Sequence, residues 1–224
     1  MNIINKLAVL AISMVFALNL NAQETKYVQI IENGKVTYTT ELTAVDSIIV
    51  NTVPANAVVI NGVRWAKYNV NTRGTFTQNI EDYGMFYQWN RATGWNSTDA
   101  TVTGWDDTYP TGTTWEASNN VCPTGWRVPT ISELASLLET ENTWTQVNGV
   151  NGRQFGSGEN LLFFPAAGSR YSSGGALGGQ GGGGYWSSTP NGSSYAHYLD
   201  FGSGNADVGS NNRTFGFSVR CVVE

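Results

Sequence analysis

The stretch Cys122-Pro-Thr-Gly-Trp-Arg-Val-Pro-Thr130 contains the first of only two cysteines in this 224-residue chain. The second cysteine closes the stretch Gly216-Phe-Ser-Val-Arg-Cys221, close to the end of the sequence. An even cysteine count in a chain that begins with an export signal predicts one disulfide, Cys122–Cys221. Such a bond closes a loop of about 100 residues and is worth roughly 4–5 kcal/mol in the chain-entropy model. It leaves no cysteine for catalysis or for a metal, and the alternative is two buried thiols without a bond.

The export signal is expected to occupy residues 1–22. A short positive region ends at Lys6, and the apolar run Leu7–Leu20 is too short to span a membrane. Ala22 provides a small residue for cleavage before Gln23, and no cysteine follows the run as it would in a lipoprotein. We therefore expect a secreted or cell-surface protein that is not inserted into a membrane.

The composition is low in charge and rich in glycine and aromatic residues. Charged residues make up 13% of the chain, beside 26 glycines, 8 tryptophans and 10 tyrosines. Abundant aromatic residues indicate a packed core rather than disorder, and short apolar runs between polar turns are typical of a mostly β domain. Without residues 1–22 the chain carries 11 basic and 17 acidic residues, a net charge of −6. This balance argues against nucleic acid or an anionic membrane as a partner.

Two structural parts are expected after the signal. Residues 23–51 form a small β module, because two β-rich runs flank Asn33-Gly34, the strongest short hairpin signal. A third run, Ser47–Val50, belongs to the same module, which is marginal alone and should pack on a neighbour or a partner. Residues 52–56 are the expected linker, and residues 57–224 the main domain.

The main domain is expected to be α+β, mostly β, with one well-defined helix. Its strands include a first hairpin over Val58–Trp65 with an Asn-Gly turn, a buried strand over Leu161–Phe164, and a strand over Tyr195–Phe201. Residues 90–120 are predicted to be a long loop. The glycine-rich residues 172–184 are predicted to be a flexible surface loop, because no lysine or phosphate-loop spacing accompanies the glycines.

The helix is predicted to begin after Thr130. Thr130 is a favourable N-cap and Glu133 completes a capping box. The apolar face of this helix is expected to consist of Ile131, Leu134, Ala135 and Leu138. The spacing leaves Glu133 facing water. This face is a core element and not a ligand site.

Several of these motifs, in their order and spacing, resemble the Fibrobacter succinogenes major paralogous domain. They are Ile60–Trp65, Tyr83–Trp89, Cys122–Thr130, Pro165–Gly168, Tyr185–Thr189 and Gly216–Cys221. The resemblance covers residues 58–224 and implies a C-type lectin-like fold, similar to formylglycine-generating enzymes and to the variable proteins of diversity-generating retroelements. It also implies a secreted or surface protein of Bacteroidetes-like bacteria. Most members have no assigned biochemical activity, so the fold does not give the function.

Catalysis and metal binding are weakly supported by the residue types. His197 is the only histidine, so a site of several imidazoles is excluded, and a Ser-His-Asp triad would lack its nucleophile elbow. Spacing singles out no carboxylate pair for glycoside hydrolysis. A hydrolase is therefore the least favoured functional class. Asp99, Asp106 and Asp107 offer calcium ligands from one loop. The Glu-Pro-Asn and Trp-Asn-Asp signatures of lectin calcium sites are absent, so we favour a solvated loop and expect no metal and no cofactor.

A ligand surface is expected between residues 187 and 213. Tyrosine, serine, asparagine and glycine combine aromatic area with adaptable hydrogen bonding, as in antibody paratopes. Strand alternation directs Leu199 and Phe201 inward and Tyr198 and Asp200 outward. The predicted ligand contacts are Asn191, Tyr198, Asp200, Asn205, Asp207, Asn211, Asn212 and Arg213. The alternative is that the asparagines and glycines simply build turns.

Arg213 is the strongest single candidate, because its planar fork suits carboxylates and sugar hydroxyls, and it is expected to be exposed. The retroelement variable proteins, which the chain resembles, display their ligand contacts in this region. The sequence therefore predicts an exported binding or adhesion protein with a lectin-like surface for a glycan or a surface protein, and not an enzyme. The alternative is a structural subunit or tip of a surface fibre with assembly partners, which an unpaired strand would favour.

Overall fold

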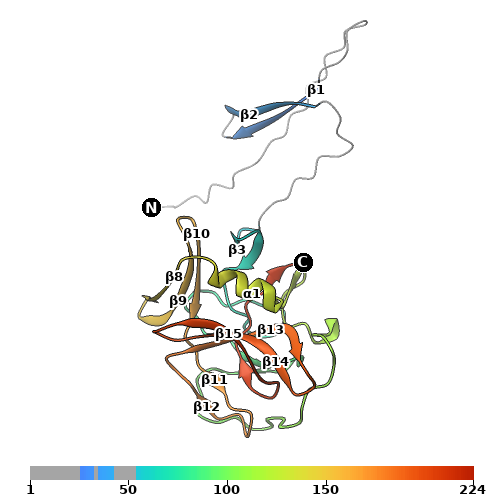
Figure 1. Cartoon of the computed structure of the whole chain (residues 1–224), viewed down its shortest axis with the longest axis vertical. Helices are drawn as coiled ribbons and strands as arrows, with labels where there is room; N and C mark the ends of the chain where they lie inside the picture. Colours follow the sequence, from blue (N-terminus) through green and yellow to red (C-terminus); the bar gives the residue numbers. More distant parts are fainter. Residues whose placement is uncertain (1–25, 33–34, 43–53) are drawn as a thin grey trace, which may run out of the picture. The chain divides into compact units, whose positions relative to one another are not determined.

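The computed structural model describes residues 26–32, 35–42 and 54–224 (Figure 1). The chain divides into two units, residues 1–52 and residues 53–224. The expected signal segment and the run Ser47–Val50 lie outside the described residues. In the part of the chain that is described, no helix combines the length and the apolar composition that a membrane crossing needs.

The first unit contains the hairpin expected around Asn33-Gly34. Strand β1 (Lys26–Glu32) pairs antiparallel with β2 (Lys35–Leu42), and the pairing register shifts between Ile30 and Ile31. No third strand joins this sheet among the described residues. The pair of β-rich runs is therefore confirmed as a hairpin.

The second unit contains four small sheets. The first has the strand order β3 (Ala57–Ile60), β4 (Val63–Ala66), β17 (Val222–Val223), β7 (Trp126–Arg127). The second has the order β12 (Leu177–Gly178), β11 (Ser169–Arg170), β16 (Gly216–Phe217), β5 (Phe86–Gln88), β6 (Gly94–Trp95). The third has the order β10 (Asn160–Pro165), β9 (Val150–Ser157), β8 (Asn142–Val147). The fourth has the order β13 (Gly183–Asn191), β14 (Tyr195–Phe201), β15 (Ala206–Asn212).

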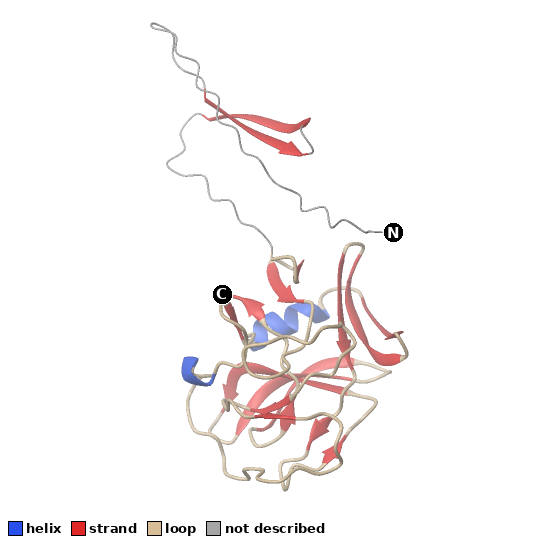
Figure 2. Cartoon of the chain, turned by 180° about the vertical axis from the view of Figure 1, so that it is seen from behind, coloured by secondary structure: helices blue, strands red, loops and turns tan. Residues whose placement is uncertain are grey.

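Helical structure is limited to α1 (Ile131–Leu138) and the short 3₁₀ helix η1 (Ala117–Asn119) in the described residues. In the described residues strands far outnumber helical segments, and Figure 2 shows a unit made mostly of strands and loops with little helix. The expected C-type lectin-like α+β fold is therefore wrong. The physical reason is that α1 has only eight residues and packs on β13, β14 and β15, so it does not form a helical layer of its own. The expectations of a mostly β domain and of one well-defined helix are confirmed.

The start of α1 follows the predicted capping box. The Glu133 backbone N–H donates to the Thr130 hydroxyl at 3.3 Å, and the Thr130 N–H donates to the Glu133 carboxylate at 2.7 Å. Leu134 and Leu137 are the buried residues of the helix, whereas the sequence pattern indicated Leu138 in place of Leu137. Glu133 does not simply face water, because it accepts two hydrogen bonds from the Arg127 guanidinium, at 2.6 and 2.8 Å.

Two hydrophobic cores lie on opposite faces of the β13–β14–β15 sheet. On one face Tyr185 and Leu199 pack with the leucines of α1, and on the other Trp186 and Ala196 pack with Phe217. Successive residues of a strand point to opposite faces, so β13 and β14 each contribute to both cores. Trp186 is fully buried.

The predicted disulfide is confirmed. Cys122 and Cys221 are bonded, with their Cα atoms 6.0 Å apart and 99 positions between them in sequence. Each cysteine lies close before a strand of the first sheet, and in that sheet Val222 of β17 pairs with Arg127 of β7. The bond thus reinforces a strand pair that joins the middle of the chain to its last strand.

Candidate functional site

Strands β14 and β15 bring several of the predicted ligand contacts onto one face. In their antiparallel register Tyr198 lies opposite Gly209, Asp200 opposite Asp207, and Ala196 opposite Asn211. Residues directly opposite one another, and residues two apart on one strand, share a face of the sheet. Tyr198, Asp200 and Asn211 therefore lie together.

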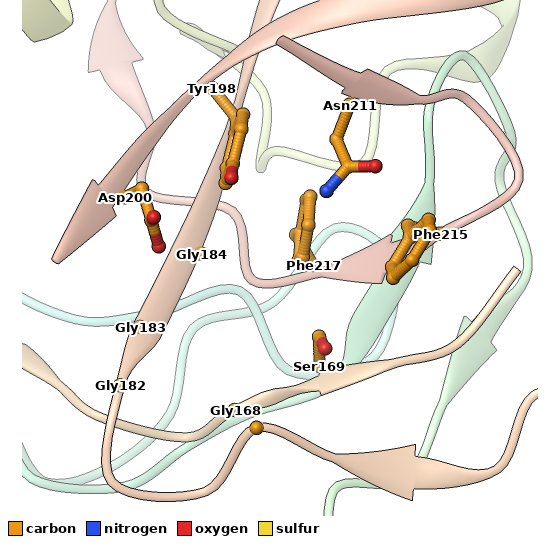
Figure 3. Close-up of a pocket in the computed structure, with 11 residues that line it drawn as sticks. Gly168, Ser169, Gly182, Gly183, Gly184, Tyr198, Asp200, Asn211, Phe215 and Phe217 are labelled. Carbon is orange, nitrogen blue, oxygen red and sulfur yellow. The ribbon is translucent and has the colours of Figure 1, made fainter. Parts of the chain in front are cut away.

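These three side chains line a cavity of about 160 Å³ (Figure 3). The rest of its wall comes from the segment 168–184 and from two phenylalanines that follow β15. They are Gly168, Ser169, Gly179, Gly182, Gly183, Gly184, Phe215 and Phe217. The cavity is thus assembled from β11, β13, β14, β15, β16 and the segments that flank them.

Glycines form one wall because side chains would not fit there. A Cβ atom on Gly184 would lie 2.6 Å from the Phe217 ring, and Gly168 has a φ of +81°, in the left-handed region that glycine adopts without strain. Gly183 and Gly184 are buried at the start of β13. The end of the glycine-rich segment is therefore a packed wall of the cavity, and the expectation of a surface loop over all of residues 172–184 is wrong.

A column of aromatic rings forms the opposite side of the cavity. The Tyr198 ring stacks on Phe217 with centroids 4.7 Å apart and planes 7° apart, and Phe215 follows at 5.7 Å. Trp186 meets Tyr198 edge to face at 6.0 Å. In Figure 3 Tyr198 lies between Asp200 and Phe217. The half-buried Tyr198 ring is thus held in place, with its hydroxyl at the cavity.

Four polar groups line the cavity. They are the Tyr198 hydroxyl, the Asp200 carboxylate, the Ser169 hydroxyl and the side-chain N–H₂ of Asn211. Ser169 is only 8% exposed. The Asn211 carbonyl oxygen accepts a hydrogen bond from the Asn212 backbone N–H at 2.8 Å, which leaves its N–H₂ group for another partner. The Tyr198 hydroxyl interacts with Asp200 and Asn211, and the Asp200 carboxylate also accepts from the Phe201 N–H. A carboxylate and a hydroxyl can each make more than one hydrogen bond, so this small network can still bind a polar ligand.

The electrostatics of the cavity affect Asp200 and Tyr198. Partial burial raises the pKa of the Asp200 carboxyl and the charge of Asp207 raises it further, although the Phe201 N–H and the Tyr198 hydroxyl act to lower it. Burial also raises the pKa of the Tyr198 hydroxyl, and the Asp200 charge adds to this effect. Tyr198 is therefore protonated at neutral pH and can both donate and accept a hydrogen bond.

The other polar residues predicted as contacts lie outside the cavity. Asn191 is exposed at the end of β13, Asn205 is exposed before β15, and Asp207 is exposed on β15. The Asn212 side-chain N–H₂ donates to the Tyr109 hydroxyl at 2.9 Å, which ties β15 to residues 108–111 of the long loop. The predicted set is thus divided, with three members at the cavity and the rest around it.

Arg213 is buried, so its predicted exposure is wrong. It is 1% exposed, and its guanidinium lies 4.0 Å from the centroid of the Trp89 ring. The guanidinium donates to four backbone carbonyls at 2.7 to 3.1 Å, those of Pro110, Gly112, Gly192 and Tyr195. Arg213 forms the base of a wider cavity of about 690 Å³ between residues 109–113 and 190–194. Its donors are already used within the protein, so Arg213 is a structural cross-link.

Ser169 and Phe217 are among the cavity residues that sequence reasoning did not identify. Both lie beside recognisable motifs, Ser169 after Pro165–Gly168 and Phe217 within Gly216–Cys221. Their orientation depends on the pairing of β11 with β16, which joins segments more than 40 residues apart. No local signal in the sequence reports that pairing.

The three aspartates of the loop over residues 90–120 each have a different partner. Asp106 forms an ion pair with Arg91 at 2.5 Å, Asp99 accepts from the Asn96 side chain at 2.9 Å, and Asp107 accepts from the Gly174 N–H at 3.0 Å. Among the residues that the structure describes, no three acidic, histidine or cysteine side chains form a group that would hold a metal ion.

One family model matches the chain. It is that of the Lcl C-terminal domain, and it matches residues 78–223, which include every residue that lines the cavity and both cysteines. No curated protein and no solved structure matches the chain. The resemblance to the Fibrobacter succinogenes domain is not tested by this match and stays a prediction.

Proposed function

The chain belongs to the Lcl C-terminal domain family, and we propose that it is an exported binding protein, secreted or held at the cell surface, whose cavity holds one sugar ring of a glycan. The observation that carries this proposal is a group of four polar side chains that line a small cavity with an aromatic wall. Export is supported by the signal features of residues 1–22.

The size of the cavity favours a single ring. A cavity of about 150 Å³ holds one benzene-sized ring, which is close to the 160 Å³ measured here. A pyranose offers both donors and acceptors, which suit the Asn211 N–H₂ group, the Asp200 carboxylate and the two hydroxyls. A recessed site of this size favours a glycan over the flat surface of a protein partner.

Binding is a better proposal than catalysis for this site. Asp200 is the one carboxylate among the lining residues. Glycoside hydrolysis ordinarily uses two carboxyl groups that flank the scissile bond. The Asp207 carboxylate lies across the strand pair and is not part of the cavity wall.

A glycan-array screen of the chain from Gln23 onward, followed by calorimetry with the sugars that bind, tests the proposal. Tyr198→Phe keeps the stacked ring and removes the hydroxyl, and Asn211→Ala removes the amide. Each is expected to weaken binding by about 0.5–1.5 kcal/mol, or roughly two- to tenfold in Kd, with the fold intact. Asn205→Ala is the control, because Asn205 is exposed and lies outside the cavity. The proposal is wrong if no glycan binds or if both cavity variants bind like the parent.

A structural role in a surface fibre is the second candidate. The observation that favours it is the two-stranded β1–β2 sheet, which has no third strand among the described residues. Open strand edges can pair with another chain. Light scattering on the chain from Gln23 onward would then show assemblies that disappear when residues 23–52 are deleted, and a monomer at all concentrations would contradict this role.

A further inference from the structure

The charge of the cavity wall is entirely negative. Asp200 is the one charged residue among the lining residues, and neither lysine nor arginine belongs to the wall. Asp207 lies directly opposite Asp200 across β14 and β15 and adds a second negative charge nearby. A half-enclosed site repels anions more strongly than open solvent does, because its effective dielectric constant is lower.

The elements packed around Asp200 supply no counter-charge. Its partner on β13 is Gly184, and Ser169 and Phe217 complete the wall without charge. The Arg170 guanidinium follows Ser169 in sequence but is fully buried, donating to Asn96, Asp99 and Gly175.

Arg153 is the other arginine in this part of the fold. It donates to the Asn142 side chain at 2.7 Å and to the Gly202 carbonyl at 3.1 Å, and it makes no ion pair with Asp200. The titratable groups that act on Asp200 are therefore Asp207, which is acidic, and the Tyr198 hydroxyl, which is neutral at physiological pH.

We propose that the cavity selects a sugar ring that carries a free, protonated amino group, a hexosamine, with Asp200 as the counter-ion of the ammonium. This inference rests on the proposed glycan-binding function and names the substrate class of the same site. The ammonium supplies the counter-charge that the cavity wall does not give the Asp200 carboxylate, and the hydroxyls of Tyr198 and Ser169 and the Asn211 N–H₂ group contact the ring hydroxyls. Sugars with sulfate or carboxylate groups are excluded by the two aspartates.

Calorimetry with glucosamine, glucose and N-acetylglucosamine at neutral pH and low salt tests this selection. Glucosamine is expected to bind about tenfold more tightly than the two uncharged sugars, a difference of about 1.4 kcal/mol. Asp200→Asn should remove this preference, so that glucosamine and glucose bind with equal affinity to the variant. Glu159→Gln is the matched control, because it makes the same charge change at an exposed turn away from the cavity.

The pH dependence separates the ion pair from the rest of the site. Affinity for glucosamine should fall as the pH drops through the pKa of Asp200, which lies above the ordinary aspartate value, whereas affinity for glucose should change less. Asp207→Asn should move this fall to lower pH, because Asp207 holds the pKa of Asp200 up.

The outcomes distinguish the inference from the function on which it rests. Equal affinity for glucose and glucosamine overturns the amine preference and leaves glycan binding standing. Failure of every saccharide to bind overturns both. Binding of an Nα-acetyl-lysine amide as tight as that of glucosamine assigns the ammonium to a protein partner and overturns the hexosamine assignment.

Discussion

Three arginines are buried, although arginine side chains in globular proteins are mostly exposed. Arg170, Arg213 and Arg220 are each at most 1% exposed. Their guanidinium groups donate mainly to backbone carbonyls, with asparagine side chains as the other acceptors. Burial lowers the pKa of Arg220 to about 10. The sequence favoured Arg213 as a ligand contact because its planar fork suits carboxylates and sugar hydroxyls. It does not show that four backbone carbonyls already surround the guanidinium.

The substitution Arg213→Lys tests whether the Arg213 side chain cross-links the segments around it. A lysine keeps the positive charge but has no planar fork, so it cannot satisfy the four carbonyls that Arg213 joins. The substitution is expected to lower the free energy of unfolding by about 3 kcal/mol in urea titrations. Arg64→Lys, on the partly exposed β4, is the control and should stay within about 0.5 kcal/mol of the parent. Equal stability of the two variants would show that Arg213 is not a cross-link.

Among the elements, local signals predicted α1 and the first hairpins but not β15. The Asn61-Gly62 turn has φ values of +48° and +77°, as a tight hairpin requires, and the Thr130 cap is local to α1. Strand β15 (Ala206–Asn212) consists largely of polar and small residues, so neither periodicity nor β propensity marks it. It is a strand because β14 supplies a full set of pairing partners on its edge, a tertiary effect.

The ion pair at the start of α1 gives this element a pH-dependent stability. Burial raises the pKa of the Glu133 carboxyl, but hydrogen bonds from Arg127 and from the Thr130 N–H outweigh burial, so the pKa lies below its usual value. A carboxyl whose folded pKa is lowered stabilises the protein above its unfolded pKa of about 4.3 and loses that contribution as the pH falls through the folded value. Urea titrations from neutral to acidic pH should therefore show Glu133→Gln less stable than the parent near neutrality, with the gap closing in acid. A gap that is constant with pH would contradict the ion pair.

For the whole molecule, the site depends on contacts that no local pattern contains. Tyr198 and Asp200 were predictable because alternation along one strand directs them outward, and Asn211 because polar composition favours it as a contact. Their joint cavity was not, because it needs Phe217 and Ser169 from another sheet. Parallel bridges between Gly168 and Gly183, and between Tyr185 and Ser218, bring that sheet against β13. The cavity is thus a product of sheet packing.

The Cys122–Cys221 disulfide is a covalent cross-link around the segments that form the cavity. The loop between Cys122 and Cys221 contains α1, the third and fourth sheets and every residue of the cavity wall, so its closure restricts the unfolded chain across the whole site. Reduction is expected to lower the free energy of unfolding by about 4–5 kcal/mol. For a chain of this length, that corresponds to a fall in Tm of roughly 10–20 °C.

Calorimetric melting with and without reductant measures this effect, and thiol titration before and after shows whether the bond was opened. Cys122→Ser and Cys221→Ser together provide a second route to the open loop and should melt close to the reduced protein. Both sulfurs lie in the core that contains Trp186 and Phe217, so opening the bond should also weaken the aromatic column and, with it, saccharide binding. Two titratable thiols in the native protein, or an unchanged Tm once both are free, would refute this account.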